Sequence, residues 1–106
     1  MPRFLVVLVT SPGRAHARRL ARALLRARLA ACVNVLDADS LFWWKGKLDE
    51  AHEALLIIKT SARHFERLRK LVCALHPYEV PEVIALPIQK AHQPYLRWVT
   101  SSLQAS

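Results

Sequence analysis

The predicted strands of this chain are apolar on both sides. Three short runs rich in branched residues have strand character: Phe4–Val9, Ala54–Ile58 and Val83–Leu86. Successive residues of a strand point to opposite faces of a sheet, so a sheet with one face in water alternates apolar and polar residues. These three runs do not alternate. The sequence therefore predicts a sheet whose two faces are both buried.

The order of the expected elements defines the fold class. After the first strand we expect a helix that is capped by Ser11, has Pro12 at its first position and runs to about Leu29. The other expected elements are a strand from Cys32 to Trp44, a tight connection at Gly46, a strand at about Glu53–Thr60, a helix capped by Ser61, a loop at His76–Pro81, a strand at Val83–Leu86 that ends near a sheet edge at Pro87, and a last helix opened by Pro94. This βαββαβ order is that of a ferredoxin-like α+β sandwich with an added C-terminal helix. The length of 106 residues predicts a single domain, 1–106.

Two helices can cover only one face of this sheet. About six large apolar side chains on the second face would stay in water, and each is worth roughly 1.5–3 kcal/mol when buried. That loss is comparable with the whole stability of a domain, about 5–15 kcal/mol. We therefore expect the second face to pack against other copies of the chain in a closed homo-oligomer, with the C-terminal helix covering only part of it.

The net charge of +8 makes nucleic acid a partner to consider. RNA-recognition modules with the same element order stack bases on aromatic residues of their central strands, whereas the run Leu55–Ile58 is aliphatic. We expect nucleic acid not to be a partner, and the stripe of Arg14, Arg18, Arg22 and Arg26 to be a solvated helix face.

No apolar run approaches the roughly 20 residues that cross a membrane. Two cysteines without a secretory signal favour a reduced, cytoplasmic setting.

The candidate metal ligands are Cys32, Cys73, His76 and Glu79. They include no Cys-x-x-Cys pair, and a closed zinc site needs four ligands. Cys32, next to Val33, is also typical of a small buried hydrophobe. The rigid loop from His76 to Glu82 concentrates polar groups, either because it carries binding residues or because its prolines shape a connection over a packed Tyr78. Both interpretations stay open.

No catalytic constellation is found. The chain has no glycine-rich phosphate loop, no Gly-x-Ser-x-Gly and no nucleophile with an obvious base, so we expect a binding protein and not an enzyme.

The adjacent Trp43 and Trp44 should point to opposite faces of a strand. We expect one on the core and the other at a subunit contact, where Trp is enriched.

Several motifs resemble those of the CutA divalent-cation tolerance proteins. They occur in order, with similar spacing, from about residue 4 to 99, and the run His76–Glu82 is highly specific. The matching segments are Leu29–Val35, Trp44–Lys47, Ile57–Thr60, Leu75–Ile88 and Pro94–Trp98. The resemblance implies a ferredoxin-like subunit in a compact homotrimer, with long second and third strands that extend across neighbours. It also implies a link to copper and other divalent metals.

Carried over by position, the resemblance implies a metal ligand at Cys32. It also implies a pocket between subunits, and the residues around it would be Trp44, Lys59, His76, Tyr78 and Glu82. Two departures weaken thiolate metal chemistry here. Phe42 stands where the family usually has Tyr, and Ser11 stands where many members have Cys.

We therefore expect a cytoplasmic homotrimer that binds copper or another divalent metal weakly, through Cys32 and His76, in a metal-ion response. No organic cofactor is expected. The alternative is a small-molecule sensor similar to nitrogen-regulatory proteins. It would hold an anionic ligand in the cleft between subunits, near Lys59 and His76.

Overall fold

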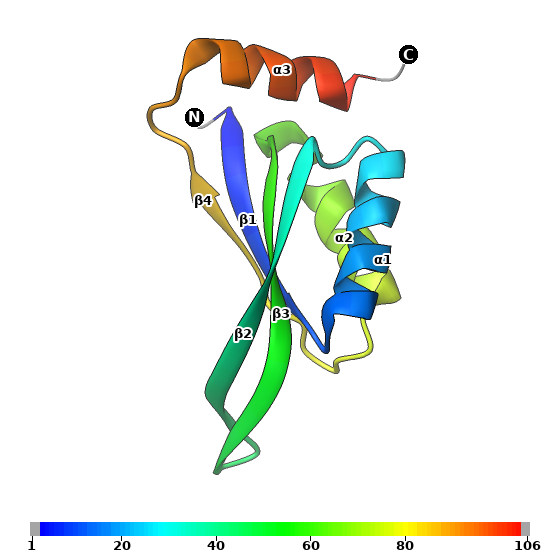
Figure 1. Ribbon diagram of the computed structural model, residues 1–106, viewed down its shortest axis with the longest axis vertical. Coiled ribbons are helices and arrows are strands. Elements are labelled where there is room, and N and C mark those ends of the chain that lie inside the picture. The colour runs from blue at the N-terminus through cyan, green and yellow to red at the C-terminus, as the bar shows by residue number, and fades with distance from the viewer. Residues whose placement is uncertain (1–2, 105–106) are drawn as a thin grey trace.

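The computed structural model describes residues 3–104 and has the predicted mixed α+β architecture. Its elements are β1 (Phe4–Ser11), α1 (Arg14–Arg26), β2 (Cys32–Trp44), β3 (Lys47–Ser61), a 3₁₀ turn (Ala62–His64), α2 (Phe65–Leu75), β4 (Val83–Pro87) and α3 (Gln93–Leu103). All neighbouring strands are antiparallel, in the order β2-β3-β1-β4. Helices α1 and α2 lie on one face of the sheet (Figure 1). The ferredoxin-like prediction is confirmed, and β4 is an edge strand, as Pro87 predicted.

The core lies between the sheet and these two helices. Residues that pair across the sheet share a face, and on the helix side the central strands contribute Val7, Val9, Leu56 and Ile58, all fully buried. The helices place their apolar stripes against these strands. The buried helix residues are Ala17, Leu20, Ala21 and Leu24 on α1, and Leu68 and Val72 on α2. The 3-and-4 spacing seen in the sequence is the stripe that folding buries.

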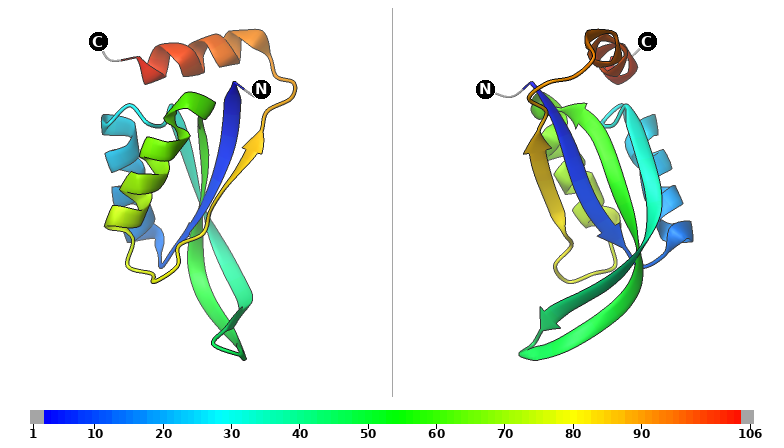
Figure 2. Two further views of the ribbon diagram at one scale, coloured as in Figure 1. Left: turned by 180° about the vertical axis from the view of Figure 1, so that it is seen from behind. Right: turned by 60° about the vertical axis from the view of Figure 1, so that its left-hand side comes forward.

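The opposite face of the sheet carries no helix. This open face, as we call it, is apolar: Val6, Leu8, Leu55 and Ile57 are half-buried at its centre, and Leu36, Ile84 and Leu86 are 43–50% exposed at its sides. Helix α3 lies across the end of the sheet (Figure 2). Its buried residues Val99 and Leu103 pack with Ala31 and Phe4, and its Tyr95 lies beside Cys32, so it covers only one end of the open face.

Strand β3 begins six residues earlier than predicted, at Lys47 instead of about Glu53. The β2–β3 hairpin therefore continues beyond the sheet as a two-stranded arm, residues 38–52, which curves away from the rest of the chain (Figure 2). Lys45 and Gly46 close the arm with φ of 51° and 79°. Two consecutive positive φ values are typical of the tight hairpin turn that favours glycine, as expected for Gly46.

Two other boundaries differ from the prediction. Strand β1 extends to Ser11 and α1 begins only at Arg14, so Ser11 does not cap the helix. Its side chain is fully buried and hydrogen-bonds to Nδ1 of His16, at 2.5 Å. Helix α1 ends at Arg26, because Arg28 adopts a positive φ of 59° and turns the chain before the expected end at Leu29.

The two tryptophans are not divided between core and surface. Trp43 is 71% exposed and Trp44 38% exposed, because both lie on the arm, beyond the reach of α1 and α2. An isolated two-stranded ribbon is marginally stable in water. The arm therefore exposes apolar surface that a single subunit does not bury.

Candidate functional site

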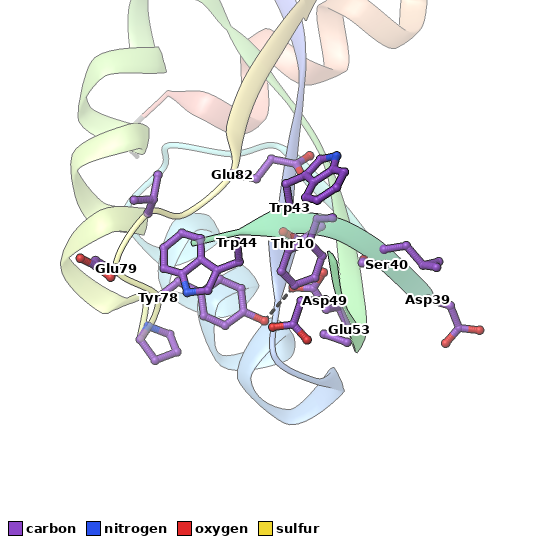
Figure 3. Close-up of a pocket in the computed structure, with 15 residues that line it drawn as sticks. Thr10, Asp39, Ser40, Trp43, Trp44, Asp49, Glu53, Tyr78, Glu79 and Glu82 are labelled. Atoms are coloured by element: carbon purple, nitrogen blue, oxygen red, sulfur yellow. Dashed lines mark hydrogen bonds between the residues drawn. The ribbon is translucent and has the colours of Figure 1, made fainter. Parts of the chain in front are cut away.

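A pocket of about 870 Å³ lies between the arm and the loop that follows α2 (Figure 3). The arm contributes aromatic and acidic side chains from both of its strands. The loop contributes residues 77–80 and 82, and Thr10 at the end of β1 completes the lining. The lining residues are Thr10, Asp39, Ser40, Leu41, Phe42, Trp43, Trp44, Asp49, Ala51, Glu53, Pro77, Tyr78, Glu79, Val80 and Glu82.

One partly buried hydrogen bond ties the loop to β3 at the base of the arm. The Tyr78 hydroxyl donates to Oε2 of Glu53 at 2.6 Å, and Glu53 is only 6% exposed (Figure 3). Burial, and next the bond to the Glu53 carboxylate, raise the pKa of Tyr78 well above its ordinary value, so this hydroxyl stays protonated and donates. The loop is therefore fixed to β3 by a charge-assisted bond inside the pocket.

His76 holds Tyr78 in position from behind the pocket. Its Nε2 donates to the carbonyl oxygen of Thr10 at 2.6 Å, and its Nδ1 accepts from the backbone N–H of Tyr78 at 3.2 Å. The rings of His76 and Tyr78 are 4.6 Å apart between centroids, and His16 packs edge-on against His76 at 5.3 Å. Both ring nitrogens of His76 therefore form hydrogen bonds that hold the loop in place.

The pocket concentrates negative charge in a basic protein. Five of the eight acidic residues line it: Asp39, Asp49, Glu53, Glu79 and Glu82. No Lys, Arg or His of residues 3–104 lies among the lining residues. Burial, and next the Glu53 charge, raise the pKa of Glu82. Of these five acids, only Asp39 has an ion-pair partner in the described chain. Its partner is His52 at 2.8 Å, and the hydrogen bond raises the pKa of His52.

Three of the predicted site residues line this pocket: Trp44, Tyr78 and Glu82. His76 supports it without lining it. Lys59 lies elsewhere, on the open face opposite Val6, where its ammonium donates to Oδ1 of Asn34. One chain by itself therefore does not form a site in which Lys59 and His76 together hold an anionic ligand.

The structure does not bring the two predicted metal ligands together. Cys32 lies across from Lys59, at the level of Val6 on β1, whereas His76 bonds to Thr10. Four residues of strand separate these levels, about 13 Å. Cys32 instead lies beside Tyr95 of α3, whose pKa rises chiefly through burial and further through the thiol. Within residues 3–104, no three His, Cys, Asp or Glu side chains are close enough to hold one metal ion.

The acids of the arm and of β3 were missed by the sequence analysis. Asp39, Asp49 and Glu53 are separated by up to 14 positions and belong to no motif. The hairpin register brings them together, with Asp39 paired to His52 and Phe42 to Asp49. The signal that could have found them is the tight turn at Gly46, since extending the pairing back from that turn places these acids on one arm.

Sequence and structure comparisons agree on one family. The family model of the CutA1 divalent ion tolerance protein matches residues 5–102. This chain belongs to the CutA1 family. The divalent-cation tolerance protein CutA of Thermus thermophilus is 46% identical to it, over 89% of this chain and 92% of that protein. The mouse Protein CutA is 47% identical over 86% of this chain, which spans only 52% of the length of that protein.

The fold agrees with solved CutA structures. The CutA protein of Archaeoglobus fulgidus, described as a periplasmic divalent cation tolerance protein, superposes with a TM-score of 0.93 at 36% identity. The match covers 95% of this chain and 99% of that one. Family membership thus connects this chain with divalent-cation tolerance. Within residues 3–104, no helix has both the length and the apolar character needed to cross a membrane.

Proposed function

We propose that this CutA1-family protein acts in divalent-cation tolerance by binding cations in the acidic pocket between the arm and the loop after α2. The supporting observation is the segregation of charge. A chain with a net charge of +8 places five of its eight acidic residues around one pocket. Such a pocket attracts cations against the positive field of the rest of the molecule.

Divalent metal binding in this pocket is weak. Carboxylate oxygens are ligands for hard divalent cations, but a tight site needs several of them on one ion, and the described residues gather no group of three. A hard cation held by only one or two carboxylates keeps most of its waters, so little of its hydration is replaced by the protein. Copper, which the sequence resemblance suggested, would compete here with harder ions and would gain no imidazole from His76.

We further propose that the protein is a homotrimer. The open face and the arm leave apolar side chains in water that only another protein surface can bury. Because the same face exists on every copy, self-association in a closed ring is the simplest way to cover it. A binding protein fits the site better than an enzyme does, because the lining hydroxyls of Thr10 and Ser40 have no His beside them among the lining residues of the described chain, and no Cys lines the pocket there.

The two cysteines favour a reducing compartment such as the cytoplasm. Cys32 and Cys73 are both free, and Cys73 is exposed. Exposed free thiols persist where the cell keeps them reduced. The alternative function, a sensor of anionic small molecules, has less support, because the pocket is acidic and Lys59 lies outside it.

Calorimetric titration of Mn²⁺ and Cu²⁺ tests the metal proposal. The Asp49→Asn variant should weaken Mn²⁺ binding several-fold, because the pocket loses a negative charge. The matched control Glu50→Gln should not, since Glu50 is the next residue on β3 and does not line the pocket. Cys32→Ser should leave Mn²⁺ and Cu²⁺ affinity unchanged. Binding that is lost in Cys32→Ser and kept in Asp49→Asn would place the metal at the thiol and end the proposal.

A further inference from the structure

The positive charge of this chain is concentrated on its helix layer, by which we mean residues 14–26 and 62–75, the segments of α1, the 3₁₀ turn and α2. This layer holds nine of the 16 Lys and Arg residues and only one of the eight acids, Glu66. The rest of the chain carries seven charges of each sign, so the helix layer accounts for the whole net charge of +8. Its basic residues are Arg14, Arg18, Arg19, Arg22, Arg26, Arg63, Arg67, Arg69 and Lys70.

Most of these charges face water without a partner. All of the basic residues except the half-buried Arg69 are exposed. Within residues 3–104 only two of the nine form ion pairs, Arg14 with Asp37 at 3.3 Å and Arg69 with Glu66 at 2.7 Å. The other seven charges of the layer are therefore available to an anionic partner.

The arginine row of α1 does not serve the stability of the helix. Arg18, Arg22 and Arg26 follow one another at intervals of four residues, and like charges at this spacing destabilise a helix. They repeat about every 6 Å along the solvent side of α1, opposite its buried residues Leu20 and Leu24. The row is thus a regular array of guanidinium groups that folding does not need.

Helix α2 extends this positive surface. The two helices contact each other on the same face of the sheet (Figure 1). Burial of His64, and next the charges of Arg67 and Arg63, lower the pKa of that ring, as expected where positive charges gather. Because the helices cover the face opposite to the open face, self-association through the open face leaves their outer side in solvent.

The chemistry of this surface fits a regular row of phosphates. Guanidinium groups bind phosphate oxygens through two parallel N–H donors. Proteins that bind single strands stack bases on aromatic rings, whereas Phe65 of the helix layer is half-buried and packs against the core. A helix that binds a membrane inserts an apolar face, but the apolar stripe of α1 is buried against the sheet. The polyanion that matches this surface is therefore the backbone of a duplex.

We infer that the outer side of α1 and α2 binds the phosphate backbone of double-stranded nucleic acid without reading its sequence. The expectation that nucleic acid is not a partner rested on the aliphatic sheet, and the helices offer a mode of binding that needs no base stacking. The inference goes beyond the cation proposal and does not depend on it, because other segments line the acidic pocket.

Fluorescence anisotropy of a short labelled DNA duplex of arbitrary sequence, titrated with the full-length protein, tests this inference. The duplex should bind at about 50 mM KCl, and its affinity should fall about a hundredfold by about 200 mM, as for about four phosphate contacts that release counterions. Arg18→Gln combined with Arg22→Gln should weaken binding about fivefold or more at the lower salt and flatten the salt dependence, because two contacts are lost. Glutamine is a helix former similar to arginine, and neither arginine has an ion-pair partner within residues 3–104, so the fold is kept.

The matched control removes two charges outside the helix layer. Lys90→Gln combined with Arg97→Gln lowers the net charge equally at exposed positions and should leave the affinity close to that of the wild type. Arg18→Lys combined with Arg22→Lys keeps the charge and should bind nearly as well as the wild type. Equal weakening by the two glutamine pairs would show attraction by net charge alone and overturn the inference.

Vesicles of phosphatidylserine and phosphatidylcholine test the membrane as the other polyanion. Binding of these vesicles without binding of the duplex would overturn the inference, and so would the absence of duplex binding at about 50 mM KCl. Either result would leave the cation proposal standing, since that proposal is tested at the acidic pocket.

Discussion

At the scale of single residues, the site depends on a short series of contacts. His76 accepts the backbone N–H of Tyr78 and is itself bonded to Thr10 on β1. Tyr78 then donates to Glu53, 25 positions earlier in the chain. The loop that begins at His76 therefore positions the Tyr78 hydroxyl, which donates a hydrogen bond to the buried Glu53 carboxylate. The role of His76 is to position Tyr78.

Replacing Tyr78 by Phe should destabilise the protein. The change leaves the buried Glu53 carboxylate without its donor, and an unsatisfied buried acceptor costs about 1–3 kcal/mol of unfolding free energy. Urea denaturation measures the effect. Tyr95→Phe serves as the control, because Tyr95 is 37% exposed on α3 and its hydroxyl lies beside the Cys32 thiol, a weak hydrogen-bond partner, instead of a buried carboxylate. Equal effects of the two changes would contradict the assigned role of Tyr78.

Glu82 should destabilise the ligand-free protein at neutral pH. Its folded-state pKa is raised above the unfolded value of 4.5 by burial and then by Glu53. The folded state therefore binds the proton more strongly, and stability falls as pH rises from that value through the raised pKa. Glu82→Gln should be more stable than the wild type at about pH 7, and the difference should approach zero at about pH 3, well below the unfolded value of 4.5, where Glu82 is protonated in both states. Thermal unfolding at both pH values checks this. A difference that grows on acidification would refute it.

At the scale of elements, the long hairpin distinguishes this chain from a plain ferredoxin-like sandwich. The arm, residues 38–52, carries most of the pocket but has no helix beneath it. Its geometry depends on the turn at Lys45 and Gly46, which fixes the register and so decides which acids face the pocket. The turn therefore shapes the pocket as well as the arm.

Gly46→Ala should destabilise the protein by about 1 kcal/mol, because a side chain at a φ of 79° is strained. Gly13→Ala is the matched control. Gly13 has an extended backbone with a φ of 172°, and its added methyl group would meet nothing within 4 Å. Its effect on the unfolding free energy should be near zero or slightly stabilising. Denaturation of the two variants side by side gives the comparison, and a larger cost at Gly13 than at Gly46 would disprove the turn assignment.

The sequence predicts the elements better than the site. Strands with branched apolar runs and helices with 3-and-4 spacing were foreseen, because burial of those residues is a local pattern. The first residues of β3 were not foreseen. Lys47–His52 is a largely polar segment, and its strand conformation comes from pairing with β2. Tyr78 and Glu82 could be chosen from their loop. Glu53 could not, because its burial results from contacts between segments distant in the sequence.

At the scale of the whole molecule, one copy of the chain leaves much apolar surface uncovered. Helices α1 and α2 cover one face of the sheet, α3 covers only one end, and the open face keeps Leu8, Ile57 and Ile84 at or near the surface. The arm adds Leu41, Trp43 and Leu48, each more than 70% exposed. Apolar surface of this extent is typical of an interface. Self-association would complete the core and would also bring other copies near the pocket.

Sedimentation equilibrium of the purified protein at micromolar concentration tests this central claim most directly. A homotrimer should give a mass of about 36 kDa, three times the 12.1 kDa of the chain. The mass should stay unchanged on dilution through the micromolar range. A stable, folded species of 12.1 kDa would contradict the account, because the open face would then remain in water without loss of the fold.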